Sequence, residues 1–153
     1  MAKYDVLPII VGLNHRSAPV EVREQLAFSD SARAEALKRL VDGQTIYEGA
    51  LLSTCNRVEV IACAHDLDRA TEQMTIFLAE ERGIPRAVFE SHLYTYSGRD
   101  AVSHVFRVAA SLDSLVVGEP QILGQLKDAY AASAALGTLG VILHRCFHKS
   151  FSV

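Results

Sequence analysis

The stretch that decides the fold is residues 45–64, TIYEGALLSTCNRVEVIACA, in which two apolar runs flank a short polar link. The runs Thr45–Leu52 and Val58–Ala64 are rich in aliphatic and β-branched residues, which is typical of strands. The link at 53–57 (STCNR) is short and polar, as expected for a tight connection between adjacent strands. The sequence therefore predicts a hairpin at the centre of the fold.

The segments around this hairpin show both strand and helix patterns. A β-branched run at Val6–Leu13 and an alternating run at Leu93–Ser97 predict two further strands. Apolar spacing and cap residues predict helices after Pro19, from Ser29 or Ser31 to Gly43, and over Asp66–Arg82, Arg99–Leu112, Pro120–Tyr130 and 139–153. Strands and helices in mixed order favour an α+β fold over a parallel doubly wound sheet.

Composition restricts the class of protein. The chain has 153 residues, 50% of them hydrophobic, and a formal net charge of -3. This length predicts one domain whose core needs neither disulfides nor a structural metal. No apolar stretch is long enough to span a membrane and the N-terminus is a poor signal peptide, so we expect a cytoplasmic protein without membrane contact. The slight negative charge argues against binding nucleic acid mainly by bulk electrostatics.

Metal and nucleotide sites are not expected. The three cysteines include no CxxC pair, and Cys63 and Cys146 fall in strand and helix patterns that place them in the core. His144 and His148 have the i, i+4 spacing of metal ligands, but a solvated helix face explains them without a metal. The nine glycines form neither GxGxxG nor GxxxxGK[ST], so the chain has no recognisable loop for a nucleotide phosphate.

Cys55 is the sharpest candidate for chemistry. It lies in the polar link two residues before Arg57, whose positive charge favours the nucleophilic thiolate. Hydroxyl and amide groups of Ser53, Thr54 and Asn56 could hold a developing oxyanion. The alternative is an inert cysteine in a hairpin turn bent at Asn56, and the local sequence leaves both interpretations open.

Two further features are weaker candidates. His104 lies at the edge of a helical apolar stripe, where it could act as general acid or base for Cys55 or be an ordinary core or surface histidine. The segment 113–121 opens a helix at Pro120, whose free N–H groups attract carboxylates, although an ordinary capped helix start explains it as well. Gln121 and Gln125 share one face of that helix.

Three motifs stand at 12–20 (GLNHRSAPV), 53–59 (STCNRVE) and 114–125 (SLVVGEPQILGQ). Together, in this order and spacing, they resemble the N-terminal catalytic domain of glutamyl-tRNA reductase, the enzyme that opens the five-carbon route to tetrapyrroles such as haem. The resemblance implies a ferredoxin-like antiparallel sheet packed with helices and followed by C-terminal helices. It also implies a catalytic domain over 1–138 and, over 139–153, the truncated start of a long connecting helix.

The resemblance assigns roles to individual residues. In that family, the cysteine of the STCNR motif attacks the ester that joins glutamate to its tRNA, and NADPH reduces the resulting thioester to glutamate-1-semialdehyde. By position, Cys55 is the implied nucleophile and His104 the implied proton donor or orienting group. The residues implied to bind the substrate are Thr54, Asn56, Arg57, Ser114, Glu119, Pro120, Gln121 and Gln125.

The resemblance also implies partners. NADPH is the cofactor of the full-length enzyme, but its binding domain and the dimerisation domain are missing, so we expect neither cofactor binding nor hydride transfer in this fragment. The implied partners are glutamyl-tRNA(Glu), a second subunit and the glutamate-1-semialdehyde aminomutase that receives the product. Two alternatives are a non-catalytic α+β module that binds a ligand or partner and has a structural Cys55, and an isolated cysteine hydrolase.

Overall fold

The computed structural model describes residues 5–112 and 121–152. This part of the chain contains one four-stranded antiparallel sheet in the order β2-β3-β1-β4. Its strands are β1 (Leu7–Asn14), β2 (Glu48–Ser53), β3 (Arg57–Ala64) and β4 (Tyr94–Ser97). β2 and β3 form the predicted hairpin, and β1 pairs with β3 along its whole length.

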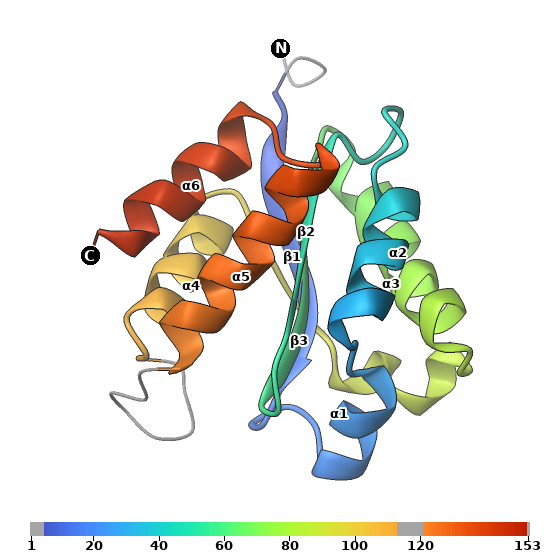
Figure 1. Cartoon of the computed structure of the whole chain (residues 1–153). Coiled ribbons are helices and arrows are strands. Elements are labelled where there is room, and N and C mark those ends of the chain that lie inside the picture. The colour runs from blue at the N-terminus through green and yellow to red at the C-terminus, as the bar shows by residue number, and fades with distance from the viewer. Residues whose placement is uncertain (1–4, 113–120, 153) are drawn as a thin grey trace.

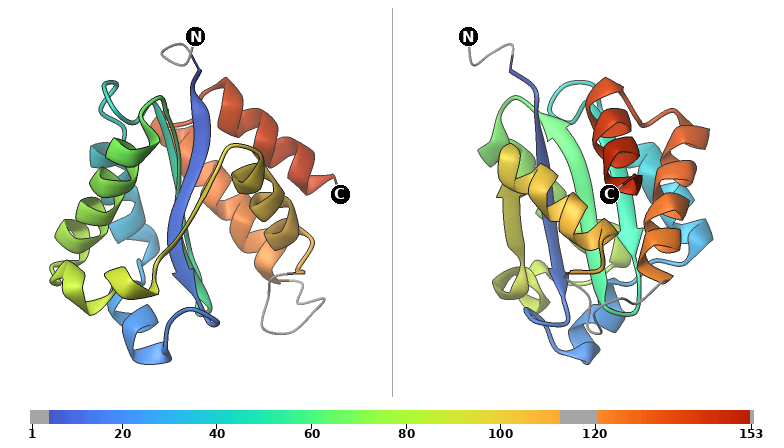
Figure 2. Two further views of the ribbon diagram at one scale, coloured as in Figure 1. Left: turned by 180° about the vertical axis from the view of Figure 1, so that it is seen from behind. Right: turned by 90° about the vertical axis from the view of Figure 1, so that its left-hand side faces the viewer.

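The helices form two layers, one on each face of the sheet (Figure 1). The first layer contains α1 (Val20–Leu26), α2 (Asp30–Leu40) and α3 (Leu67–Arg82). The second contains α4 (Arg99–Ala109), α5 (Gln121–Leu136) and α6 (Val141–Phe151). Figure 2 shows both layers from two further sides, with the sheet between them. Two short 3-10 helices, η2 (Arg86–Val88) and η3 (Glu90–His92), lead from α3 to β4.

This topology confirms the predicted fold class. The order of elements from β1 to β4, together with the strand order in the sheet, is that of a ferredoxin-like fold. α4, α5 and α6 are the predicted C-terminal helices, and they cover the face of the sheet that α1–α3 leave open. Within the described ranges, no helix has the length and apolar character needed to cross a lipid bilayer.

Cap residues fix several of the predicted helix ends. The Ser29 side chain accepts a hydrogen bond from the backbone of Ala32 at the start of α2, and Asp66 does the same for Arg69 in α3. Gly83 ends α3 in the left-handed conformation at φ 64°, which glycine adopts without strain.

Four predicted boundaries are wrong, each for a local reason. α2 ends at Leu40 rather than at Gly43, because the backbone N–H groups of residues 42 and 43 donate to the Ile46 carbonyl instead of continuing the helix. β2 begins at Glu48 rather than at residue 45, because the Asp42 side chain accepts the backbone N–H groups of residues 44, 45 and 46 and holds them in a turn. α4 ends at Ala109 rather than at residue 112, and Ser111 has a left-handed φ of 64°. α5 continues to Leu136 because its second half is rich in alanine, the best helix former.

The sheet has a separate hydrophobic core on each face. Val58, Val60 and Ala62 of β3 pack in the core under α1–α3. Ile61 and Cys63, which alternate with them, pack in the core under α4–α6. Cys146 of α6 is buried in this second core too, as the sequence predicts for both cysteines.

Candidate active site

Cys55 lies in the turn between β2 and β3, and its side chain is exposed. Thr54 fixes the shape of this turn. Its Oγ1 accepts the backbone N–H groups of Asn56 at 3.1 Å and of Arg57 at 3.2 Å, and its own N–H donates to the Arg57 carbonyl at 2.8 Å. The thiol is therefore presented to solvent from a turn whose backbone is tied by three hydrogen bonds.

The first helix supports this turn from the side. Asn14, the last residue of β1, pairs with Arg57, so the loop that leads to α1 begins next to the turn. From α1, the Arg23 side chain donates to the carbonyl of Ala18 at 2.7 Å and to that of Cys55 at 3.4 Å. The guanidinium of Arg23 thus connects the loop, the helix and the backbone of the candidate nucleophile.

A buried polar cluster lies a short way along β3. The Glu59 carboxylate accepts hydrogen bonds from the Tyr94 hydroxyl and from Nε2 of His104, and Nη1 of Arg57 lies 3.6 Å from its Oε2. The side chains of Arg57, Glu59 and His104 are at most 1% exposed. Burial alone raises the pKa of Glu59, but the hydrogen bond from His104 and the positive charge of Arg57 outweigh it and lower the pKa overall. Glu59 is therefore ionised at neutral pH.

These contacts orient the His104 ring. Because an ionised carboxylate only accepts hydrogen bonds, Nε2 must carry the proton that faces Glu59. The ring stacks on Tyr96 with a centroid distance of 4.5 Å and an interplanar angle of 22°. Nδ1 of His104 makes no hydrogen bond in the described structure, and it is buried together with the rest of the side chain.

Gly12 makes room for this cluster. It pairs with both Glu59 and Tyr94 across the sheet. A Cβ atom at position 12 would lie 2.5 Å from the carbonyl oxygen of Val58 and 2.9 Å from Cγ of Glu59, which is closer than real atoms approach. The first residue of the GLNHRSAPV motif is therefore glycine because the Glu59 side chain occupies the space above it.

The structure brings only some of the predicted site residues together. Arg57 and His104 meet through Glu59, and Nε2 of His104 contacts Glu59 rather than the thiol of Cys55. Gln121 is exposed and Gln125 half-buried in the first turns of α5, which start at the same end of the sheet as the β2–β3 turn (Figure 1). The predicted residues that lie outside the described ranges are Ser114, Glu119 and Pro120.

Sequence reasoning missed Glu59, Tyr94 and Tyr96 as members of the cluster. One signal was present, because Glu59 is a charged residue inside an apolar strand whose neighbours, Val58 and Val60, are both buried. A charge in that setting needs a partner, and the sequence alone does not say which residue supplies it.

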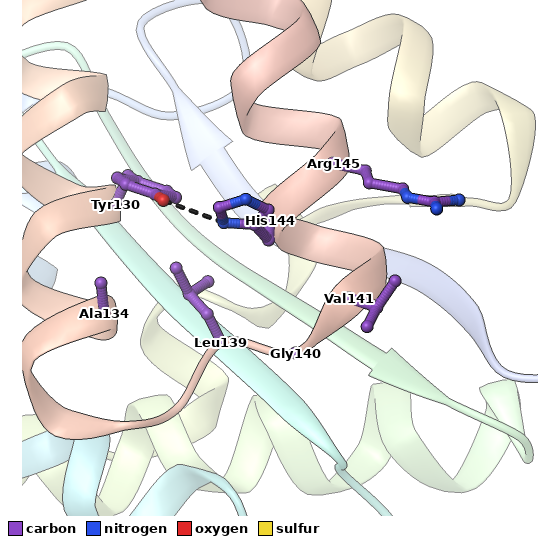
Figure 3. Close-up of a pocket in the computed structure, with 7 residues that line it drawn as sticks. All are labelled: Tyr130, Ala134, Leu139, Gly140, Val141, His144 and Arg145. Carbon is purple, nitrogen blue, oxygen red and sulfur yellow. Dashed lines mark hydrogen bonds between the residues drawn. The ribbon is translucent and has the colours of Figure 1, made fainter.

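A cavity of about 440 Å³ lies elsewhere, between the end of α5 and the start of α6 (Figure 3). None of the predicted site residues lines it. At its edge, the Tyr130 hydroxyl is 2.9 Å from Nδ1 of His144 and 2.9 Å from Nε2 of His148. Both histidines are exposed, as the sequence predicts, and the described residues contain no cluster of three or more His, Cys, Asp or Glu that could hold a metal.

Comparisons with known proteins agree on one family. A family model described as "Glutamyl-tRNAGlu reductase, N-terminal domain" matches residues 11–153. The chain is 52% identical to the glutamyl-tRNA reductase of Pelobacter propionicus and 48% identical to that of Geobacter sulfurreducens, in each case over 145 residues, 95% of this chain and 33% of the relative.

A solved structure agrees with these sequence matches. The glutamyl-tRNA reductase from Methanopyrus kandleri superposes with a TM-score of 0.74 and 34% sequence identity, over 99% of this chain and 33% of that chain. This chain thus spans about a third of the length of the relatives that it matches. The resemblance that the three motifs indicate is confirmed, and the chain belongs to the family of glutamyl-tRNA reductase N-terminal domains.

Proposed function

We propose that this chain is the glutamyl-accepting part of an NADPH-dependent glutamyl-tRNA reductase, with Cys55 as the nucleophile. The observation that carries the proposal is the exposure of Cys55 on a turn fixed by Thr54, while the other two cysteines, Cys63 and Cys146, are buried. The names of the relatives supply the substrate, glutamyl-tRNA. The family resemblance implies the setting, which is the first step of tetrapyrrole biosynthesis.

In the proposed reaction, the Cys55 thiolate attacks the carbonyl carbon of the ester that joins glutamate to tRNA. A carbon–sulfur bond forms, the carbon–oxygen bond to the terminal ribose breaks, and the ribose oxygen takes up a proton as it leaves. The products are free tRNA and a glutamyl thioester on Cys55. This transfer involves no change of oxidation state, so it needs no cofactor.

The surrounding residues support this step in different ways. The Thr54 hydroxyl oxygen accepts two backbone N–H groups and still has its own proton to donate to a substrate oxygen. We assign Asn56 to the same role from the other side of Cys55. Nδ1 of His104 is proposed to exchange the proton with the leaving group once the residues that bury it move aside, because Nε2 is held by Glu59.

We propose that residues around the turn and in α5 recognise the glutamate moiety. Arg57 suits a carboxylate, but its side chain is fully buried, so a substrate can reach it only after the covering residues move aside. The amides of Gln121 and Gln125 lie in the first turns of α5. Three more residues are proposed on the resemblance alone, namely Ser114, Glu119 and Pro120.

We also propose that NADPH binds outside the described residues. In a dinucleotide-binding fold, backbone N–H groups after the first strand hold the pyrophosphate. Here the Oδ1 atom of Asn14 already accepts the N–H groups of Arg16 at 2.9 Å and Ser17 at 3.2 Å. We therefore place hydride transfer outside this chain and derive no step through the cofactor.

Further proposals rest on the family resemblance and concern the longer protein. They comprise a catalytic domain over 1–138 that leads into a connecting helix from 139, a homodimer, transfer of the product to the glutamate-1-semialdehyde aminomutase, and a location in the cytoplasm. α6 begins at Val141 and packs on the sheet through Leu143 and Phe147, so the described part of that segment contributes to the second core.

The test is mass spectrometry of the intact chain after incubation with glutamyl-tRNA. The wild type should gain the mass of one glutamyl group, and the Cys55→Ser variant should gain none. The control variant Cys146→Ala should gain the same mass as the wild type. Burial raises the pKa of the Cys146 thiol to about 11, so iodoacetamide at neutral pH should also label Cys55 first. An unmodified wild type would refute the proposal and favour the non-catalytic binding module.

A further inference from the structure

The two helical layers differ in how their positive charges are paired. In the layer formed by α1–α3, two of the exposed cations have close carboxylate partners: Arg39 lies 2.7 Å from Glu81 and Lys38 lies 2.8 Å from Glu35. In the same half of the molecule, Arg86 of η2 lies 2.6 Å from Glu72.

The second layer has cations without such partners. The Lys and Arg residues of α4, α5 and α6 are Arg99, Arg107, Lys127, Arg145 and Lys149. Against them, these helices contain two acidic residues, Asp100 and Asp128, and α6 contains none. Over the described ranges, none of the five cations makes an ion pair with a carboxylate. The net charge of -3 therefore hides an excess of unpaired positive charge on one face of the molecule.

Three of these cations form a surface that we call the basic α5–α6 face, defined by Lys127, Arg145 and Lys149, all exposed. Arg145 and Lys149 are one helical turn apart on α6. The Lys127 ammonium lies 5.7 Å from the centre of the Phe151 ring, which places this lysine of α5 beside the last turn of α6. Arg145 is one of the residues that line the cavity, and Figure 3 shows its side chain extending away from Tyr130 of α5.

Aromatic rings lie next to these charges. Tyr130 and His144 contact each other with centroids 5.9 Å apart, and the His144 and His148 rings are 4.4 Å apart. Both histidines are exposed on the same helix as Arg145. Cations interleaved with exposed planar rings suit RNA, because phosphates pair with the cations and unstacked bases pack on the rings.

We propose that the basic α5–α6 face binds the phosphate backbone of tRNA. This proposal rests on the proposed function, since the substrate named for that function supplies the RNA. α5 starts at the end of the sheet where Cys55 lies and runs toward the other end, a length of about 24 Å for its 16 residues. An RNA whose aminoacylated end reaches Cys55 can thus lie along the second helical layer with its phosphates over Lys127, Arg145 and Lys149.

The test measures the binding of deacylated tRNA to the whole chain by fluorescence anisotropy at several salt concentrations. The triple variant Lys127→Ala, Arg145→Ala, Lys149→Ala should bind more weakly than the wild type. Each phosphate contact contributes about 0.7–0.9 to the slope of log K against log salt, so the slope should become shallower by about 2 to 3. Between about 50 and 200 mM salt, these three contacts account for about a 20- to 40-fold change in wild-type affinity.

The matched control is the triple variant Lys38→Ala, Arg39→Ala, Arg86→Ala. It removes the same number of positive charges from the other half of the molecule, where these three residues pair with carboxylates. It should keep the wild-type slope. Equal losses in both triple variants, or no tRNA binding by the wild type at low salt, would overturn the proposal. Equal binding of polyglutamate and tRNA would also overturn it and assign the face to an acidic protein.

The outcome can be separated from that of the proposed function. Deacylated tRNA has no ester, so Cys55→Ser should bind it as the wild type does. The triple variant should still form the Cys55 adduct with a small glutamyl ester that lacks the tRNA body. Loss of tRNA binding with intact adduct formation supports the surface, whereas loss of adduct formation in the wild type refutes only the thiol chemistry.

Discussion

Replacing Glu59 with glutamine tests whether the buried carboxylate holds the candidate site together. The carboxylate accepts hydrogen bonds from His104 and Tyr94 and faces Arg57 at 3.6 Å. Glutamine keeps the volume, removes the charge and turns one acceptor into a donor. Hydrogen bonds to a charged group contribute about 1.5–3 kcal/mol each, and breaking a buried ion pair costs about 3–5 kcal/mol. Because the amide oxygen still accepts one bond, we expect the free energy of unfolding to fall by about 3 kcal/mol.

The loss should depend on pH in a defined direction. Burial raises the pKa of Glu59, but the hydrogen bond from His104 and the charge of Arg57 lower it below the ordinary value of 4.5. A carboxylate whose pKa is lower in the folded than in the unfolded state stabilises the protein above the unfolded pKa and loses that contribution as the pH falls through the folded pKa. The difference between wild type and Glu59→Gln should be constant near neutral pH and shrink below 4.5.

The assay is urea unfolding followed by circular dichroism at pH 7 and at acid pH. Glu72→Gln is the control, because this carboxylate is exposed and pairs with an exposed Arg86, so its removal should change stability very little. The reasoning is wrong if Glu59→Gln loses less than about 1 kcal/mol at pH 7, the size expected of an exposed ion pair. It is also wrong if the difference in the free energy of unfolding between the variant and the wild type does not become smaller at acid pH.

Three other substitutions test the packing of the fold by urea unfolding, at Gly12 beside the buried cluster, at Gly124 as its control, and at Glu48 beside the start of α6. Gly12→Ala should cost about 3 kcal/mol, because its Cβ would meet the Val58 backbone, whereas Gly124→Ala in α5, which meets no atom within 4 Å, should add about 0.5–1 kcal/mol. Equal effects of the two would contradict the close packing at Gly12. Glu48→Gln should cost about 1–2 kcal/mol and speed amide exchange in the first turn of α6, since this buried carboxylate accepts N–H groups there at 2.8, 2.9 and 3.3 Å. Unchanged exchange would show that Glu48 does not hold α6.

The parts of the fold that are encoded locally could be predicted from the sequence. The hairpin follows from two apolar runs around a polar link, and Ser29, Asp66 and Gly83 mark helix ends by their own chemistry. The element boundaries that depend on contacts between a side chain and the backbone could not be predicted from the sequence. β2 starts later than predicted because the Asp42 side chain accepts three backbone N–H groups and holds the preceding residues in a turn. The spacing of apolar residues does not reveal these hydrogen bonds.

The candidate site likewise has residues that the sequence predicts and residues that it does not. Cys55 could be identified because its motif is contiguous and its turn is local. Glu59 could not, because the hydrogen bond that explains its burial joins residues 45 positions apart in the chain. The net charge of -3 likewise conceals where the charges lie, because Arg39 and Arg86 in one half of the molecule pair with carboxylates while the described cations of α4–α6 do not.

The buried polar cluster also fixes the register of the sheet. Side chains alternate along β3, so Arg57 and Glu59 face α4–α6 while Val58 and Val60 face α1–α3. A slip of one residue would place both charges in the apolar core under α1–α3 and would expose Gly12 to a different neighbour. Unpaired buried charges cost far more than the strand pairing gains, so only the observed register satisfies Arg57 and Glu59. Arg57 and Glu59, in the strand that follows the candidate nucleophile, thus also prevent β3 from pairing in any other register.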